Sequence, residues 1–468
     1  MRLWCGKGVH EARRRKILNG QPQRGKKKKL PLDLLEREVG ALEATAQRIR
    51  FYGQRSFMEI VNLCFEQNKR PVRPGEKIRI RFLHVVPSYW PAWRSFYQAC
   101  LADARLEVMI ILLDCTGTFL EDSQHLGARE LLEGLGLPYK DYVDYDLVTD
   151  KPHLVFYNLP YNNEYEYFRK FSPDLVKAIG MRPLYCTYGI EYDAAKYKEN
   201  LNVLHYFYNA QALAWRSFVM HNDIKEGYFR FCRTGGEHVI ALGHPKFDAY
   251  AGTPKDLPQE IIKKLNGRKL IVYQVHHLNN HDCRYKYRTH HLPWREITAI
   301  IHWLAEQETV FTVITIHPGF VRWAVERGQP SAEELELLQR FIQESPNTLL
   351  FQGDYQILFP FADAFISGQS SLLLEMVYQN KPVLYLYDEP LHLKPFAKEI
   401  FSSFYHGRGY GYGLADVQEF VAHLHSGDDP LAHTRQMVWD KSFSCYDGQI
   451  GWRIKESMLD RLLTSIHR

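Results

Sequence analysis

Apolar stretches recur along the chain at intervals that predict alternating strands and helices. Residues Leu106–Leu113 form a continuous apolar run, which is typical of a strand covered on both faces. Further runs of strand type, separated by helical periodicity, are Ile78–Pro87, His153–Leu159, Pro183–Thr187, Lys269–Val275, Val310–His317, Thr348–Gln352, Ala362–Ser367 and Pro382–Tyr387. Because the alternation restarts after Gly243, we expect two parallel, doubly wound α/β sheets in series.

Helical patterns precede and follow the two predicted sheets. An apolar stripe with spacings of 4, 3, 4 and 3 is formed by Leu35, Val39, Leu42, Ala46 and Ile49. A second helix is expected over 57–65, the stretch 69–77 has the prolines and glycine of a linker, and the amphipathic helix Gly451–Ile466 is expected to cross back to the first sheet. We therefore expect a basic helical extension (1–76), a first α/β domain (77–242), a second α/β domain (243–435) and a returning C-terminal helix (436–468).

The positive charge of the chain is concentrated at its N-terminus. The formal net charge is +5, and the first 30 residues hold eleven Lys and Arg against one Glu, which is 11 − 1 = +10 and leaves 5 − 10 = −5 for the rest. Such a tail suits an anionic membrane surface, at about 1 kcal/mol per basic residue, or a polyphosphate; the alternative is a solvated arm without a partner. Aromatic residues do not interleave with the basic run, so no nucleic-acid partner is expected.

Nothing in the sequence predicts membrane insertion, a disulfide framework or a structural zinc site. No window offers the roughly 18 consecutive apolar residues of a membrane-spanning helix, and the first residues lack the apolar segment of a signal peptide. The eight cysteines are scattered without a CxxC pair, as expected of reduced thiols. We expect a cytoplasmic protein, and the basic tail suggests that it attaches peripherally to the inner face of the cell membrane.

Candidate donor-binding residues follow the strands of the second predicted sheet, where open α/β sheets place ligands. In the segment FADAFISGQSSLLLEM (361–376), Ser370 and Ser371 open a helix, and free backbone N–H groups at a helix start bind anions. Glu375 follows one turn later, where a carboxylate can accept hydrogen bonds from ribose or donor hydroxyls. The alternative is a serine N-cap with a buried glutamate.

Histidines end two further strands of the second sheet. His317 closes VFTVITI and precedes a proline, so it can donate to a phosphate or act as an acid, with a core histidine as the alternative. His276 and His277 follow LIVYQV, and adjacent side chains on an extended chain point to opposite sides, so one of the two is expected to face the ligand. Nearby His281, His290 and His291 lack the spacing of a standard zinc site, so no metal is expected.

The first domain supplies candidates for the acceptor. Ser88 and Trp90 follow the first strand, and Tyr188 follows Pro183–Thr187. Glu191 and Asp193, two residues apart on an extended segment, face the same side and are candidate bases.

Seven of these segments, in this order, resemble the CDP-glycerol glycerophosphotransferase-like family of teichoic-acid and capsule assembly. The segments are VVPSYWPAWRSFYQACLADARLEVMIILL, PHLVFYNLPYN, LYCTYGIEY, GHPKFD, TIHP, DYQILFPFADAFISGQSSLLLEMVYQNKPVLYLYD and SFSCYDGQIGWRI. The resemblance, from about Lys77 to Leu463, implies a GT-B fold, in which two Rossmann-like domains face a cleft with a nucleotide donor in the second and an acceptor in the first. It implies donor contacts for Gly243, His244 and Lys246, a catalytic or phosphate-contacting role for His317, and donor roles for the serine pair and Glu375.

The sequence departs from the teichoic-acid polymerases of this family at two positions. Tyr188 stands where their W-H-G-T segment has its proposed histidine base, and an unperturbed tyrosine, with a pKa near 10, is a poor base at neutral pH. Gly368 replaces an aspartate common in those polymerases. Either Glu191 or Asp193 takes the role of base, or the chain transfers a sugar instead of glycerol phosphate.

The expected function is transfer of glycerol phosphate, or a closely related unit, from a CDP-activated donor to a hydroxyl of a cell-surface glycan or its lipid-linked precursor. A carboxylate of the first domain would deprotonate the acceptor, and His317 with the serine pair would stabilise the leaving phosphate. No cofactor or metal is expected. The alternatives are a nucleotide-sugar-dependent GT-B glycosyltransferase and a non-enzymatic binder of an anionic polymer.

Overall fold

The computed structural model describes most of the chain beyond its N-terminal extension. Described residues are 53, 56–113, 127–160, 166–190, 194–195, 206, 208–276, 292–317, 320, 330–368, 370–386, 392–393, 395–406, 413–443 and 446–464. By its internal contacts the chain divides into Met1–Gln54 and Arg55–Arg468. The basic tail and the apolar stripe at 35–49 therefore lie outside the described residues, and both predicted sheets fall within the second unit.

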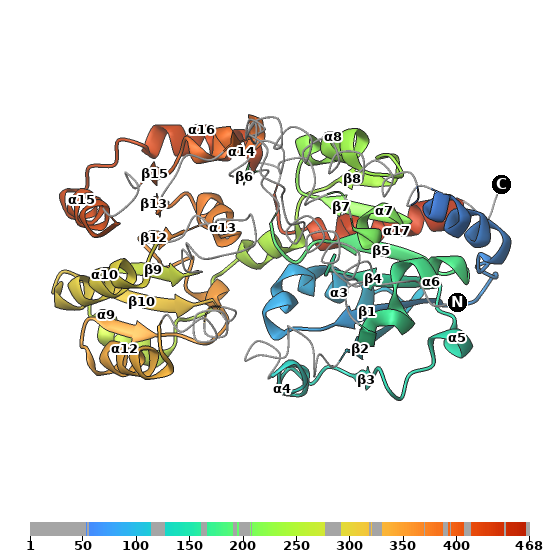
Figure 1. Ribbon diagram of the computed structural model, residues 1–468, viewed down its shortest axis with the longest axis horizontal. Helices are drawn as coiled ribbons and strands as arrows, with labels where there is room; N and C mark the ends of the chain where they lie inside the picture. Colours follow the sequence, from blue (N-terminus) through green and yellow to red (C-terminus); the bar gives the residue numbers. More distant parts are fainter. Residues whose placement is uncertain are drawn as a thin grey trace, which may run out of the picture. The chain divides into compact units, whose positions relative to one another are not determined.

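The first sheet has seven parallel strands in the order β3-β2-β1-β4-β5-β7-β8 (Figure 1). The strands are β1 (Ile78–His84), β2 (Leu106–Leu112), β3 (Tyr139–Asp141), β4 (Leu154–Tyr157), β5 (Arg182–Cys186), β7 (Arg216–Val219) and β8 (Val239–Ala241). All seven residues of β1 but Arg79 are buried, as expected of a strand with helices on both faces, and the buried residues include Arg81 and His84.

The second sheet has six parallel strands in the order β11-β10-β9-β12-β13-β15. The strands are β9 (Lys269–Val275), β10 (Val310–Ile316), β11 (Thr348–Leu350), β12 (Ala364–Ser367), β13 (Val383–Tyr385) and β15 (Tyr405–His406). A separate antiparallel pair joins β6 (Ala194–Ala195) to β14 (His392–Leu393). The two sheets confirm the predicted fold class of two α/β sheets in series.

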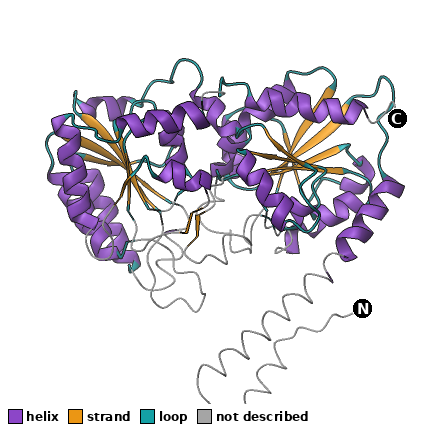
Figure 2. Ribbon diagram, turned by 90° about the horizontal axis from the view of Figure 1, so that it is seen from above, coloured by secondary structure: helices purple, strands orange, loops and turns teal. Residues whose placement is uncertain are grey.

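Helices lie on both faces of each sheet (Figure 2). Residues 56–68 are helical and precede β1. Around the first sheet lie η1 (Pro87–Ala92), α3 (Arg94–Leu101), α4 (Ala128–Gly134), α5 (Leu147–Asp150), η2 (Glu166–Phe171), α6 (Pro173–Ala178), α7 (Asn209–Ala212) and α8 (Asn222–Phe231). Then follow η4 (Pro245–Tyr250), α9 (Gln259–Leu265), α10 (Trp294–Glu306), α12 (Ala332–Glu344), η5 (Tyr355–Ile357), α13 (Leu372–Tyr378), α14 (Pro395–Phe401), α15 (Gly413–Ser426), α16 (Ala432–Ser442) and α17 (Ile450–Thr464). No helix among the described residues is long and apolar enough to cross a membrane.

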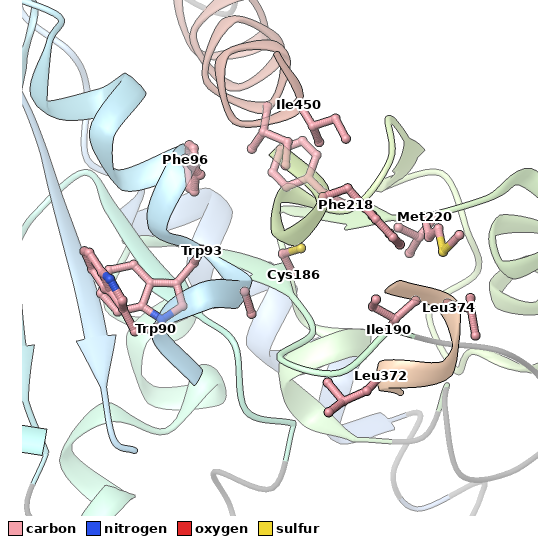
Figure 3. Packing of buried hydrophobic residues seen from close by; sticks show 14 of the residues in the cluster. Trp90, Trp93, Phe96, Cys186, Ile190, Phe218, Met220, Leu372, Leu374 and Ile450 are labelled. Carbon is pink, nitrogen blue, oxygen red and sulfur yellow. The ribbon is translucent and has the colours of Figure 1, made fainter. Parts of the chain in front are cut away.

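One buried apolar cluster contains residues of both sheets. Ile190 and Met220 from the first half share it with Leu372 and Leu374 of α13 (Figure 3). Fully burying a side chain of this kind stabilises a fold by roughly 1.5–3 kcal/mol. The start of α13, which holds the candidate serines, is thus fixed by a core that it shares with the first half of the chain.

The last helix, α17, packs on α3 next to β1 and on η4. Its buried residues Ile450, Ile454, Met458 and Leu462 repeat every fourth position, which places them on one face. Gly451 permits the close approach, because a Cβ there would lie 2.4 Å from the backbone carbon of Ser95. The carboxylate of Asp248 accepts hydrogen bonds from the first two amides of the helix, Ile450 N at 3.0 Å and Gly451 N at 2.7 Å.

Candidate functional site

The strand order of the second sheet locates its ligand-binding edge. From the central strand β9 the chain moves to β10 and β11 on one side, and then returns to β12 and β13 on the other. This reversal between β9 and β12 is a topological switch point, where open α/β sheets bind ligands outside the carboxyl ends of their strands. His276 directly follows β9, and Gly368 directly follows β12, so the structure brings two predicted segments to this point.

His317 follows β10, the other neighbour of β9, and its ring lies against that of His276. The two ring centroids are 4.5 Å apart with an interplanar angle of 61°. The backbone N–H of His317 donates to the carbonyl of Val275 at 2.8 Å, which extends the sheet by one bond. Burial lowers the pKa of His317 to about 4, so at neutral pH the ring is uncharged and offers a single N–H donor. His277 lies outside the described residues.

Ser370 and Ser371 stand at the start of α13, which begins at Leu372. Ser370 is buried, and its Oγ accepts a hydrogen bond from the amide of Leu372 at 3.2 Å. Ser371 is half-buried, and its side chain makes no capping bond to a described residue. A Cβ placed on Gly189, in the loop after β5, would lie 3.9 Å from Ser371 Oγ. The first half of the chain therefore approaches the second at this serine.

Glu375 is fully buried, and its carboxylate faces protein donors. Lys246 Nζ lies 3.1 Å from Oε1, and the hydroxyl of Tyr250 donates to Oε2 at 2.5 Å. Tyr355 OH donates to Oε1 at 3.1 Å and Gln356 Nε2 to Oε2 at 3.0 Å. The sequence suggested hydrogen bonds to ribose for this carboxylate, whereas in this arrangement both of its oxygens are taken up by side chains of the same chain.

The segment GHPKFD, assigned to the donor from the resemblance, lies between the two sheets in sequence, and all of it except Asp248 is buried. Gly243 has φ 97°, a left-handed conformation that favours glycine. His244 Nδ1 accepts from the amide of Lys246 at 3.2 Å, and its Nε2 lies 2.9 Å from the carbonyl oxygen of Thr187. Burial lowers the pKa of His244 to about 3, so its ring is neutral at pH 7. These side chains bind neighbouring elements of the protein, which the sequence motif alone did not indicate.

The first sheet has its own switch point, between β1 and β4. Ser88 is exposed in η1, directly after β1, while Trp90 is buried there and packs edge-on against Trp93 at 4.6 Å. Tyr188 stacks on Tyr89 with centroids 4.1 Å apart and an angle of 22°. The predicted acceptor residues thus include one exposed hydroxyl, one stacked tyrosine and one core tryptophan.

Both candidate bases lie outside the described residues. Glu191 and Asp193 fall in the gap between Ile190 and β6, the two-residue strand Ala194–Ala195. The strand β6 pairs with β14 of the second half, with Ala194 opposite Leu393 and Ala195 opposite His392. The backbone that follows Asp193 is therefore joined to the second half by a strand pair.

Sequence reasoning missed several polar residues that the structure places at these edges. His84 ends β1 and is completely buried, and neither ring nitrogen has a hydrogen-bond partner among the described residues; burial lowers its pKa to about 3. Asp248, Tyr250 and Gln356 connect the segment after β8 to α17 and to Glu375. No local signal marks these residues, and His84 does not stand out within its strand, because β1 also carries Arg79 and Arg81.

Across the described ranges, no group of three or more His, Cys, Asp and Glu side chains could hold a metal ion. His281, His290 and His291 lie outside them.

Comparison with known proteins establishes the fold. No protein-family model matches the chain, and no curated protein sequence does. Among solved structures, a putative UDP-N-acetylglucosamine 2-epimerase from Listeria monocytogenes superposes with a TM-score of 0.56 at 12% identity, over 83% of this chain and 97% of that one. The S. aureus protein MnaA with UDP gives 0.53 at 14% identity, over 83% and 97%. The wall teichoic acid polymerase TagF, with CDPG, gives 0.51 at 12% identity, over 92% of this chain and 99% of that one.

The fold is GT-B. It accounts for the two doubly wound sheets, and at these identities the similarity extends to the fold alone.

Proposed function

We propose that this chain is a GT-B transferase that binds a nucleoside-diphosphate-activated donor at the switch point of its second sheet. The observation that carries the proposal is the gathering of His276, His317 and Ser370–Ser371 at the carboxyl edge of β9, β10 and β12. A neutral imidazole N–H and a serine hydroxyl are hydrogen-bond donors for a diphosphate, and they need no metal to act. In this proposal residues 77–242 hold the acceptor, and residues 243–435 hold the donor.

The donor we propose is CDP-glycerol, and the transferred group is glycerol phosphate. The acceptor hydroxyl oxygen bonds to the phosphorus that carries glycerol, the bond from that phosphorus to the bridging oxygen breaks, and CMP leaves with the electron pair. The acceptor proton passes to Glu191 or Asp193, and His317 donates a hydrogen bond to the charge that develops on the phosphates. The family resemblance of the sequence supports this choice, as does the match to TagF over 92% of the chain.

The acceptor we propose is a hydroxyl of a cell-surface glycan or of its lipid-linked precursor. Such an acceptor is tethered to a membrane, and the +10 charge of residues 1–30 would hold the enzyme at an anionic cytoplasmic surface. The exposed Ser88 and the stacked Tyr188 are the first-domain side chains that we assign to the acceptor.

A nucleotide-sugar glycosyltransferase is the second candidate. The structures with UDP or a UDP-sugar among the similar folds favour it, and so does Tyr188, which stands in place of a histidine base. In that case the acceptor oxygen would bond to the anomeric carbon and UDP would leave. A non-enzymatic binder of an anionic polymer through the basic tail is the third reading.

The donor can be identified by the nucleotide that is released. The full-length protein is incubated with CDP-glycerol and separately with a panel of UDP-sugars, with and without a glycan acceptor, and products are separated by ion exchange. If CDP-glycerol is the only donor turned over and CMP is released from it, glycerol phosphate transfer is supported. If UDP is released from a UDP-sugar, the glycosyltransferase is supported. If no donor is turned over and neither CDP nor UDP binds in calorimetry, the proposal of a donor site is wrong.

A further inference from the structure

The carboxylate of Glu375 is the meeting point of three separate segments. It is fully buried and takes one ion pair and three hydrogen bonds, from Lys246, Tyr250, Tyr355 and Gln356, at 2.5–3.1 Å. Lys246 and Tyr250 belong to η4, and Tyr355 and Gln356 to η5, while Glu375 itself lies in α13. The network therefore ties α13 to the segment that leaves the first sheet and to the turn after β11.

The same network reaches a helix of the first sheet. Arg94, the first residue of α3, donates from Nη2 to Gln356 Oε1 at 3.2 Å and lies 3.5 Å from the carboxylate of Asp354. The Gln356 side chain also donates to the carbonyl of Lys246 at 3.1 Å. A path of hydrogen bonds thus runs from α3 through Gln356 to Glu375.

The segment that carries Lys246 is attached to the acceptor side as well. Two residues earlier, His244 bonds to the carbonyl of Thr187 at 2.9 Å, directly before Tyr188. Ser95 of α3 donates to the carbonyl of Pro245 at 3.1 Å. Three consecutive residues, His244, Pro245 and Lys246, therefore contact the loop after β5, the helix α3 and the helix α13.

We propose that Glu375 and Lys246 are positioning residues, which hold Gly368, Ser370 and Ser371, the turn before α13, in place against the loop after β5 and do not contact the donor. The inference rests on the proposed function, because it concerns the same donor site. Its physical basis is that Glu375 lies one turn along the short helix that Ser371 opens, so a carboxylate fixed from four directions fixes that helix start. The geometry of the donor site then depends on a junction that belongs to both halves of the chain.

Within this network the charges of Lys246 and Glu375 depend on each other. Lys246 is 4% exposed and Glu375 0%, so each charge has lost its water and depends on the other. Removing one partner leaves an uncompensated buried charge, which is far more harmful than removing both. This asymmetry separates a positioning role from direct donor contact.

The experiment compares Glu375→Gln with the double variant Glu375→Gln/Lys246→Met. The glutamine keeps one carbonyl oxygen, which can accept from one of the two tyrosines, since Tyr250 and Tyr355 donate to different oxygens of the carboxylate. The methionine removes the cation while it keeps most of the side-chain volume. Three quantities are measured on each full-length variant: melting temperature, affinity for CDP and UDP well below the melting transition, and hydrogen exchange of the amides of Gly368, Ser370 and Ser371. Glu336→Gln, in the exposed pair with Arg340 on α12, is the matched control for loss of a glutamate charge.

The single variant is expected to lower the melting temperature by roughly 10 °C, to raise exchange at the turn, and to weaken nucleotide affinity at least about tenfold. The double variant is expected to restore all three quantities most of the way, and Glu336→Gln to change none of them. If the double variant regains its melting temperature and turn protection but not its affinity, Glu375 or Lys246 contacts the nucleotide and the inference is overturned. It is equally overturned if Glu375→Gln changes neither stability nor exchange.

Two further measurements cover the cases in which Glu375→Gln does not fold or the unaltered protein binds no nucleotide. If Glu375→Gln does not fold, Tyr355→Phe and Tyr250→Phe remove one donor each and keep the charge pair, and each is expected to produce a smaller change in the same three quantities. If the unaltered protein binds no nucleotide, the proposed function fails. The exchange measurement at the turn still reports whether Glu375 positions it, so the two failures are distinguishable.

Discussion

Acidification from pH 7.5 to 5 should destabilise this protein through histidines that are buried in their neutral form. His84, His153 and His244 are each at most 1% exposed, and burial is the largest cause that lowers their pKa values, to about 3, about 4 and about 3. Two of the rings also accept backbone hydrogen bonds at Nδ1, His153 from Arg79 N at 3.0 Å and His244 from Lys246 N at 3.2 Å. Protonation at that nitrogen would break the bond.

The sign and size of the effect follow from proton linkage. The unfolded chain takes up a proton at each histidine near pH 6.5, whereas the folded chain does so only near pH 3 to 4, so folding is favoured above 6.5 and loses stability as the pH falls towards the folded values. At pH 5 each residue contributes a loss of about (6.5 − 5.0) × 1.36, or roughly 2 kcal/mol, and the three together roughly 6 kcal/mol. Carboxylates with lowered pKa values, such as Asp103 and Asp150, titrate below this window in the unfolded chain.

Urea unfolding at pH 7.5, 6.5, 5.5 and 5.0 measures the loss directly. His84→Met removes a ring with no hydrogen-bond partner in the described part of the chain. Between pH 6.5 and 5 the variant should take up about one proton fewer on unfolding, so its free energy of unfolding should depend less steeply on pH. The exposed His433→Gln should leave the slope unchanged. A free energy of unfolding that stays constant from pH 7.5 to 5, or an unchanged slope in His84→Met, would refute the reasoning.

Four other outcomes are expected. His317→Ala should reduce turnover about 10²–10³-fold with a small change in melting temperature, and normal turnover with a lowered melting temperature would make this histidine structural. Gly451→Ala should cost about 3 kcal/mol of stability, measured by urea unfolding, since its Cβ would lie 2.4–2.7 Å from the backbone of Ser95 and Phe96; an unchanged midpoint would contradict the packing of α17 on α3. Turnover should persist in EDTA, and its loss with recovery on adding a divalent cation would indicate a metal site. Removal of residues 1–30 should weaken binding to anionic vesicles in a sedimentation assay and spare hydrolysis of a soluble donor, whereas unchanged vesicle binding at low salt would exclude a membrane role for the tail.

The strands with long apolar runs were predictable from the sequence. The predicted strand Lys269–Val275 is β9 as observed, and Val310–His317 and Leu106–Leu113 are each one residue longer than β10 and β2. Buried parallel strands need apolar residues on both faces, so their sequence pattern is strong. The predicted strand Ile78–Pro87 was too long, because the chain leaves the sheet after His84 and Pro87 starts the short helix η1.

The short strands, and the contacts between residues of the site, could not be predicted from the sequence. Strand β7, Arg216–Val219, begins with two polar residues and is a strand because β5 and β8 pair with it on either side. Glu375 and Lys246 are 375 − 246 = 129 residues apart, and nothing local to either predicts that they form an ion pair. The histidines and serines were chosen as candidates because they follow strands, and the carboxyl ends of parallel strands share one edge.

The packing of α17 on α3 has a consequence for how the protein is made. The first sheet and α3 leave the ribosome early, but the helix that covers α3 ends at Thr464, which is 464 − 101 = 363 residues after the end of α3 at Leu101. At about 5–20 residues per second, that interval lasts roughly 20 to 70 s. During this interval the side of α3 that α17 covers lacks that helix, so the nascent chain presents a surface for chaperones until α17 has been synthesised.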